Sequence, residues 1–456
     1  MTLLRSVGRR FAALAHAISA GIATASLLSA PSAAQTAPLS AQQSDPDVMG
    51  WMKGVPPPRA RIITQPDSVY FSFPKLRWSV CHLRELLPTE EISRGLGAPR
   101  PLEYPPPYQF ANDRQAIDAL TFTPIGSDKT MTWEESLSAN YTDGLLILHK
   151  GRVVYERYFG CLNPAGKHAA MSMTKSLTGL LASILVAEGK LNETAPVSDI
   201  IPELKGKAYG SATVRQVMDM TTGLRFSEDY SDPDADIWRY SAAVNPLSKP
   251  EPGQMPSGYF DYLPAVESQG EHGAAFHYKT IDADMLGWIV SRVSGKSVTE
   301  LASERLWQPM GAEQDAYMTV DGTGVPFAGG GLSAGLRDLG RLGQLMVNEG
   351  VIGGERLFPA EAVRSIREGG DASKFGSNYP TLLGGRYSSM WWIYPGHEGV
   401  FAARGVHGQT IYVDPSADMV LVRYASYPRA ENPLIDPTSL PAFRAVAAYL
   451  KSHQTD

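Results

Sequence analysis

The sequence predicts an α+β fold: an antiparallel sheet that the two chain ends complete, flanked by helices, with an all-helical lobe. Strand-like runs rich in branched and aromatic residues lie at 145–148 and 152–159, and four more fall between 388 and 424. Over 190–320, helical patterns alternate with loops rich in Gly, Pro and Asp. Strands at both ends of a helical centre are typical of a single sheet closed by the two ends of the chain.

The expected elements follow in order along the chain. His149-Lys150-Gly151 joins the first two strands as a tight hairpin. The next helix ends at Gly189 and carries its apolar face on Leu177, Leu180, Leu181, Ile184 and Leu185. A second helix is expected at about 282–293, late strands at 388–393, 400–404, 410–413 and 419–424, and a closing amphipathic helix at 441–451.

Residues 1–34 have the pattern of a secretory signal peptide. Arg5, Arg9 and Arg10 precede an apolar run of small residues over 11–30, and Ser32-Ala33-Ala34 supplies the small residues of a cleavage site. Cleavage after Ala34 predicts an exported protein, periplasmic or secreted, with no stable membrane contact. The alternative is that the apolar run stays as a membrane anchor, because its length approaches that of a spanning helix.

The rest of the chain divides by composition. Residues 35–60 are polar and Pro-rich and predict a flexible leader, residues 61–114 an extension packed on the main domain, and residues 115–456 the main domain. Cys81 and Cys161 are the only cysteines. They either pair in an oxidising compartment or stay as two buried thiols.

Charge and motif content exclude several classes of function. The formal net charge is −6 and no long basic block is present, so nucleic-acid binding is not expected. The nine His form no HExxH motif and the two Cys no CxxC motif. We therefore expect no metal and no cofactor.

Ser172-Met173-Thr174-Lys175, at the start of the first strong helix, is the central chemical signal. A spacing of three places the two end side chains on one helix face, a turn apart. A serine hydroxyl is a weak nucleophile that needs an adjacent base, and a lysine can be that base when its surroundings keep it neutral. By itself, S-x-x-K also occurs in proteins that use neither residue.

Two later segments offer partners for this pair. Tyr278-Lys279-Thr280 precedes the second helix, and its phenol could relay protons to a leaving group. Gly405-Val406-His407-Gly408-Gln409-Thr410 begins a late strand, where a backbone N–H can share an oxyanion with that of Ser172. Each segment alone is equally an ordinary loop–helix junction or strand start.

Together and in this order, the three segments resemble the signature of the β-lactamase-like serine hydrolases: S-x-x-K, then Y-x-N or Y-x-S, then K-T-G or H-x-G. The resemblance spans about 115–450 and implies a β-lactamase/transpeptidase-like fold. It implies Ser172 as nucleophile and Lys175 with Tyr278 as its proton partners, leaving open which of the two is the general base. It also implies an oxyanion hole from the amides of Ser172 and Thr410, if His407 aligns with the family's final lysine.

The sequence departs from the β-lactamase pattern at two motifs. Thr280 replaces the family's Asn, and His407-Gly408-Gln409 replaces its Lys-Thr-Gly. Both positions contact the β-lactam in the family, so the changes favour another small amide or ester as substrate. Thr280, His407 and Gln409 are then candidate substrate-binding residues.

Within this superfamily, the sequence resembles the 6-aminohexanoate-dimer (nylon-oligomer) hydrolases most. These enzymes use a second tyrosine on a loop that closes over the substrate amide, and Tyr230 in the segment 226–232 matches that place. The aspartates of this loop either attract a substrate amino group or are simply solvated. The expected activity is hydrolysis of a small amide or ester through an acyl-enzyme. A family VIII-type carboxylesterase and a penicillin-binding or non-catalytic module on the same fold are the alternatives.

Overall fold

The computed structural model describes residues 38–64, 69–247, 257–396 and 399–453. Residues from Leu39 onward group into one unit. The expected signal peptide, residues 1–34, lies outside the described residues. Of the helices in the described ranges, none is long and apolar enough to cross a membrane.

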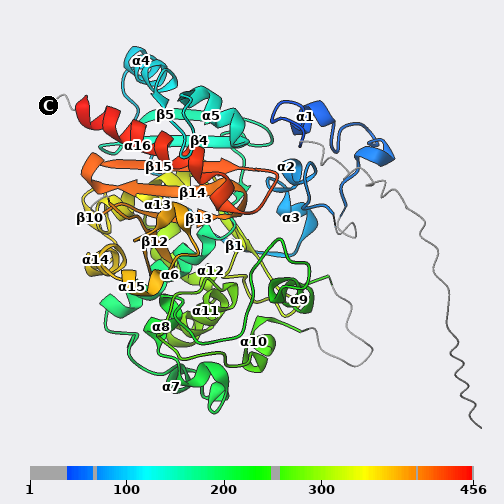
Figure 1. The fold of residues 1–456 in the computed structure, drawn as a ribbon, viewed down its shortest axis with the longest axis vertical. Coiled ribbons are helices and arrows are strands. Elements are labelled where there is room, and N and C mark those ends of the chain that lie inside the picture. Colours follow the sequence, from blue (N-terminus) through cyan, green and yellow to red (C-terminus); the bar gives the residue numbers. More distant parts are fainter. Residues whose placement is uncertain (1–37, 65–68, 248–256, 397–398, 454–456) are drawn as a thin grey trace, which may run out of the picture. The chain divides into compact units, whose positions relative to one another are not determined.

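The main sheet is antiparallel and takes its strands from both ends of the domain, which confirms the predicted fold class (Figure 1). Its strand order is β11-β12-β13-β14-β15-β4-β5, so the pairing of β15 with β4 joins the last strand to the early hairpin. The strands are β4 (Thr142–His149), β5 (Arg152–Tyr158), β11 (Arg386–Ser388), β12 (Trp391–Ile393), β13 (Phe401–Gly405), β14 (Gln409–Asp414) and β15 (Met419–Ala425).

Two tight turns in this sheet illustrate what the pattern could and could not predict. Lys150 and Gly151 both have positive φ (52° and 78°), as a two-residue hairpin between β4 and β5 requires. The single strand expected at 388–393 is wrong, because Ser389 and Met390 (φ 47° and 66°) make a similar turn between β11 and β12. Serine and methionine rarely adopt positive φ, so composition gave no sign of this break.

A smaller sheet leads directly to the candidate nucleophile. It has the order β1-β7-β8-β6 and consists of β1 (Thr89–Ile92), β7 (Ala316–Thr319), β8 (Leu332–Ala334) and β6 (His168–Ala169). Two further strand pairs are β2 (Thr121–Phe122) with β3 (Met131–Thr132), and β9 (Val351–Ile352) with β10 (Glu355–Arg356). Because β1 comes from the segment 61–114, that extension is built into the domain.

Helices cover both faces of the main sheet and form the lobe beside it (Figure 1). The predicted helices appear as α6, α11 and α16, and α16 begins five residues before the expected start at 441. The α-helices are α1 (Pro46–Met49), α2 (Leu76–Ser79), α3 (Leu83–Leu86), α4 (Pro107–Asp118), α5 (Trp133–Ala139), α6 (Met173–Ala187), α7 (Val197–Ile200), α8 (Val214–Met218), α9 (Asp236–Ala243), α10 (Tyr259–Tyr262), α11 (Thr280–Ser294), α12 (Val298–Ala302), α13 (Leu336–Val347), α14 (Glu361–Glu368), α15 (Ala372–Phe375) and α16 (Asp436–Ser452).

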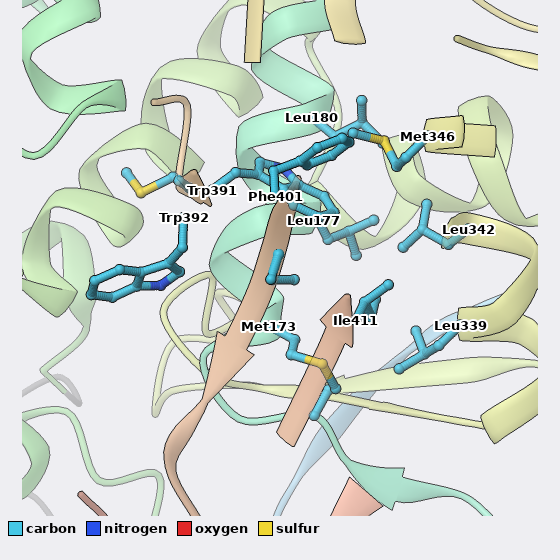
Figure 2. Close-up of a cluster of buried hydrophobic side chains, with 14 of the residues drawn as sticks. Met173, Leu177, Leu180, Leu339, Leu342, Met346, Trp391, Trp392, Phe401 and Ile411 are labelled. Atoms are coloured by element: carbon cyan, nitrogen blue, oxygen red, sulfur yellow. The ribbon is translucent and has the colours of Figure 1, made fainter. Parts of the chain in front are cut away.

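Alternating side chains of the sheet join the two helical layers. On β14, Ile411 lies with side chains of α6 and α13 (Figure 2), whereas the ring of the next residue, Tyr412, lies 5.5 Å from that of Phe443 on α16. Residues of α6 are buried continuously over 173–185. The helix that carries the candidate nucleophile is therefore enclosed on all sides and positions its first turn rigidly.

Residues 38–60, the described part of the flexible leader expected at 35–60, are instead packed against the domain. Arg77 on α2 is 2% exposed and donates hydrogen bonds to the Ala41 carbonyl and the Ser44 hydroxyl, and it forms a 2.9 Å ion pair with Asp143 on β4. A buried guanidinium needs such partners, and the early segment supplies two of them.

Cys81 and Cys161 form a disulfide across 80 residues of sequence, which decides between the two alternatives for these cysteines. Among the described residues, the side chain of His168 lies close to both sulfurs, so that these three residues bring potential metal-ligand atoms together. Because both sulfurs are in the disulfide, they offer no thiolate to a metal.

Candidate active site

Ser172 sits at the junction between the smaller sheet and the buried helix. It follows β6 and occupies the N-cap position of α6 (φ −67°, ψ −3°), while Met171 before it has the uncommon positive φ of 50°. The serine is 9% exposed and lines a pocket. Its hydroxyl thus stands at the positive end of the α6 dipole, which favours negative charge there.

Lys175 contacts Ser172 directly. Its Nζ lies 3.1 Å from Ser172 Oγ and donates a 2.6 Å hydrogen bond to the Gly329 carbonyl. Burial lowers the pKa of Lys175, although the carboxylates of Glu228 and Asp284 oppose that shift. The neutral amine, which can accept the serine proton, is therefore favoured.

Asp284 on α11 binds Gly329, the residue whose carbonyl accepts the hydrogen bond from Lys175. Its carboxylate accepts hydrogen bonds from the Gly329 N–H (3.0 Å) and the Tyr240 hydroxyl (2.6 Å). Burial raises the pKa of Asp284 to about 7. No motif in the sequence points to this residue, because its link to Lys175 runs through Gly329, 45 residues further along the chain.

Tyr278 completes the group around Ser172. The Ser172 side chain acts on its phenol and lowers the phenol's pKa, against the larger effect of burial, and Lys175 Nζ lies 5.0 Å from the centroid of its ring. The ring packs on Trp392 at a centroid distance of 5.6 Å. Burial raises the pKa of Tyr278 well above its ordinary value, so the phenol keeps its proton and can deliver it to a neighbouring atom.

The pocket next to these three residues has a volume of about 370 Å³. Five aromatic side chains line it together with charged groups, and the predicted Tyr230 is one of them. The lining residues are Ser172, Phe226, Glu228, Tyr230, His277, Tyr278, Asn378, Tyr379, Trp392, Arg404, Gly405, Val406, Ala430, Glu431, Asn432, Pro433 and Asp436.

Glu228 ties the loop of Tyr230 to the catalytic group. Its carboxylate accepts hydrogen bonds from the Tyr230 hydroxyl (2.5 Å), and from the N–H (2.6 Å) and hydroxyl (2.8 Å) of Thr280. It therefore binds the N-terminus of α11, where a negative charge is favourable. From the sequence, only the aspartates of this loop were considered as functional residues, and Glu228 was not. Its position two residues before Tyr230 could have indicated a contact with that tyrosine.

Four predicted substrate-binding or oxyanion residues lie outside the pocket lining. Thr280 is buried behind Glu228, and His407 is turned away, with its Nδ1 2.7 Å from the Tyr427 carbonyl. Gln409 and Thr410 are buried in the sheet, where the Gln409 amide binds the carbonyls of 406 and 425 and the Thr410 hydroxyl binds that of 403. Thr410, the predicted second oxyanion donor, therefore does not line the pocket that contains Ser172.

The pocket is lined instead by the end of β13 and the residue after it, Arg404-Gly405-Val406. Gly405 lies so close to the turn before Ser172 that a Cβ on it would be 2.7 Å from the Ala170 carbonyl oxygen. Only a glycine permits this approach of β13 to the turn before Ser172. Val406, the next residue, lines the pocket together with Ser172. A buried serine–lysine pair with a tyrosine partner, on this sheet and helical lobe, defines a serine hydrolase of the β-lactamase/transpeptidase-like fold.

The chain belongs to the β-lactamase family, whose model matches residues 139–438, more than half of the sequence. It is 32% identical to 6-aminohexanoate-dimer hydrolase of Paenarthrobacter ureafaciens over an alignment of 360 residues. This alignment covers 78% of this chain and 86% of the relative. These matches confirm the resemblance inferred from the three motifs.

Solved structures agree with this assignment. A Bacillus anthracis structure assigned as a 6-aminohexanoate-dimer hydrolase has a TM-score of 0.75 and 27% identity, covering 86% of this chain and all of that one. EstCE1, a hydrolase with promiscuous acyltransferase activity, has a TM-score of 0.51 and 16% identity, covering 75% of this chain and 99% of its own. The second likeness shows the shared fold alone.

Replacing Gly405 by alanine is expected to lower kcat for a p-nitrophenyl ester by about 10²–10³, because it would displace the backbone N–H of Val406, which we expect to act with that of Ser172 as the second oxyanion donor. The added Cβ would push the strand end away from the Ala170 carbonyl. Gly97→Ala is the control, because nothing lies within 4 Å of a Cβ there. Equal kcat for both variants would contradict the role of this close contact.

Replacing Glu228 by glutamine is expected to move the acidic limb of the kcat/KM profile to lower pH. The Glu228 charge raises the pKa of Lys175, so its removal leaves the amine neutral at lower pH. Ester hydrolysis between pH 5 and 9 measures the limb. Glu267→Gln, at an exposed glutamate paired with Arg225, is the control. A limb that moves to higher pH, or stays in place, would show that the Glu228 charge does not act on Lys175.

Proposed function

We propose that the enzyme hydrolyses small linear amides of the 6-aminohexanoate-oligomer type through an acyl-serine intermediate. The observation that carries this proposal is the contact of Lys175 Nζ with Ser172 Oγ at the edge of an aromatic pocket that also contains Tyr230. The 32% identical relative named as a 6-aminohexanoate-dimer hydrolase supports the choice of substrate.

In the first half of the reaction, neutral Lys175 accepts the Ser172 proton as Oγ bonds to the carbonyl carbon of the substrate. The backbone N–H groups of Ser172 and Val406 stabilise the oxyanion that forms. Tyr278 delivers a proton to the leaving nitrogen as the C–N bond breaks, and Lys175 restores the proton to Tyr278. The amine product leaves and the acyl group stays on Ser172.

In the second half, a water molecule attacks the acyl carbon and gives a proton to the same lysine–tyrosine pair. The oxyanion forms again in the same hole, and its collapse releases the acid and returns the proton to Ser172 Oγ. The pKa directions favour Lys175 as the base and Tyr278 as the donor, since burial favours the neutral form of each. The two groups share one proton path and titrate as a pair.

An activity panel tests the substrate class. The enzyme, without its first 34 residues, is assayed with 6-aminohexanoate dimer, short p-nitrophenyl esters and a chromogenic cephalosporin. We expect turnover of the dimer and of the esters, with little of the cephalosporin. Rapid ester hydrolysis without turnover of the dimer would replace the proposal by a carboxylesterase function, and efficient cephalosporin turnover would replace it by a β-lactamase function.

We also propose that the enzyme is exported, in the periplasm or outside the cell. The basic and apolar pattern of residues 5–34 supports this location, and so does the Cys81–Cys161 disulfide, since such bonds persist mainly in oxidising compartments. Sequencing of the mature protein from the exported fraction is expected to begin at Gln35. Full-length protein in the cytoplasmic fraction would contradict export.

A further inference from the structure

Among the residues that the structure describes, Arg404 provides the one guanidinium in the lining of the active-site pocket. It lies on β13 directly before Gly405, and its guanidinium carbon is 5.5 Å from the centroid of the Trp392 ring. Tyr278 packs on the Trp392 ring as well. A guanidinium in this place, next to the nucleophile, would ordinarily bind a carboxylate on the substrate.

Asp436 already binds this guanidinium. The first residue of α16, Asp436 forms a hydrogen-bonded ion pair with Arg404 through Oδ1, and the two side chains are 5% and 8% exposed. Its second oxygen, Oδ2, accepts a 2.5 Å hydrogen bond from the Thr381 hydroxyl. Because Oδ2 is held by a third residue, the carboxylate is fixed in place and cannot easily turn away to admit a competing anion.

The remaining charges of the pocket have the opposite sign. Glu228 and Glu431 line it together with Asp436, against the single arginine. Glu431 is paired with Arg429, which is 61% exposed and does not line the pocket. The wall therefore presents an excess of carboxylates, which attract an ammonium group and repel an anion.

We infer that Asp436 is a specificity-determining residue that withholds Arg404 from substrate carboxylates, so that the site selects substrates whose chain ends near Arg404 are cationic or neutral. For its substrate type, an amide with a free amino end, this inference rests on the proposed function. The effect of Asp436 on Arg404 requires only that the enzyme be a serine hydrolase, so ester substrates test that effect independently of the amide.

The test uses two matched sets of substrates. The first is a p-nitrophenyl ester series whose six-atom acyl chains end in an ammonium, a methyl or a carboxylate group. The second is an amide series with the same three groups at the end of the amine, so that either orientation in the pocket is covered. For the wild type we expect kcat/KM for the ammonium and methyl compounds to exceed that for the carboxylate compound by about tenfold or more in at least one series.

Asp436→Asn is expected to raise kcat/KM for the carboxylate compound at least tenfold relative to its methyl analogue, because it frees the Arg404 guanidinium. Glu431→Gln changes the charge of the pocket by the same amount and leaves Arg404 paired, so it is the matched control. Adding Arg404→Met to Asp436→Asn should remove the gain, and this double variant leaves no unpaired buried charge.

Three results would overturn the inference. The first is that the wild type turns over the carboxylate compounds as well as the methyl compounds in both series. The second is that Glu431→Gln raises kcat/KM for the carboxylate compound as much as Asp436→Asn does. The third is that this rise persists in the double variant. The wild-type comparison needs no substitution, so it stands even where Asp436→Asn does not fold, as a thermal melt would reveal. Ester hydrolysis without turnover of 6-aminohexanoate dimer would refute the proposed substrate while leaving this test intact.

Discussion

Ser172→Ala is expected to lower kcat by a factor on the order of 10⁴–10⁶ and to abolish covalent labelling by a fluorophosphonate probe. The loss is large because no acyl-enzyme can form without Oγ, and the oxyanion hole and pocket then act only on attack by water. Turnover of a p-nitrophenyl ester gives kcat, and intact-protein mass spectrometry detects the adduct. KM is expected to change much less, since Oγ supplies little of the pocket wall.

Ser183→Ala is the matched control for this experiment. Ser183 is buried on the same helix, and its hydroxyl has no hydrogen-bond partner among the described residues. The control should keep wild-type kcat and full labelling. Hydrolysis retained by Ser172→Ala, or labelling of a different serine, would refute Ser172 as the nucleophile.

Lys175→Met is expected to lower kcat by about 10³–10⁴, in the upper range for loss of a general base. Methionine has nearly the volume of lysine, so the buried site stays filled, but no atom remains 3.1 Å from Oγ to take its proton. Lys175→Arg should be almost as poor, because a guanidinium stays protonated at any working pH. Ester turnover from pH 5 to 10 measures the loss, and the acidic limb should disappear with the lysine.

Lys190→Met, at a lysine whose side chain is 59% exposed, serves as the control and should retain activity. Thermal melts separate loss of catalysis from loss of fold. Lys175→Met loses the hydrogen bond to the Gly329 carbonyl but buries an apolar side chain in place of an amine, so its melting temperature should stay close to that of the wild type. An enzyme that keeps wild-type kcat after this substitution would have another base, and Tyr278→Phe would then be the variant to compare.

The fold was predictable to the extent that each element carries its own periodic pattern. The hairpin of β4 and β5 and the helices α6 and α11 appear close to their expected limits, because their apolar spacing and their glycines lie within the element itself. The turn at Ser389 and Met390 was missed, since packing imposes their positive φ without any local signal. The packing of residues 38–60 was missed for a related reason: their partner Arg77 lies further along the chain.

The pairing of Ser172 with Lys175 followed from the sequence alone, because a spacing of three on a helix brings two side chains together whatever surrounds them. The neutrality of the lysine, in contrast, depends on burial by the whole domain. Val406, and not Thr410, lines the pocket with Ser172, because β13 meets the turn before Ser172 in a contact that spans more than two hundred residues of sequence. Glu228 beside Thr280, Asp436 on Arg404 and the bond between Cys81 and Cys161 likewise join residues 32 to 80 positions apart. No local pattern encodes contacts of that kind, so only the packed chain could decide them.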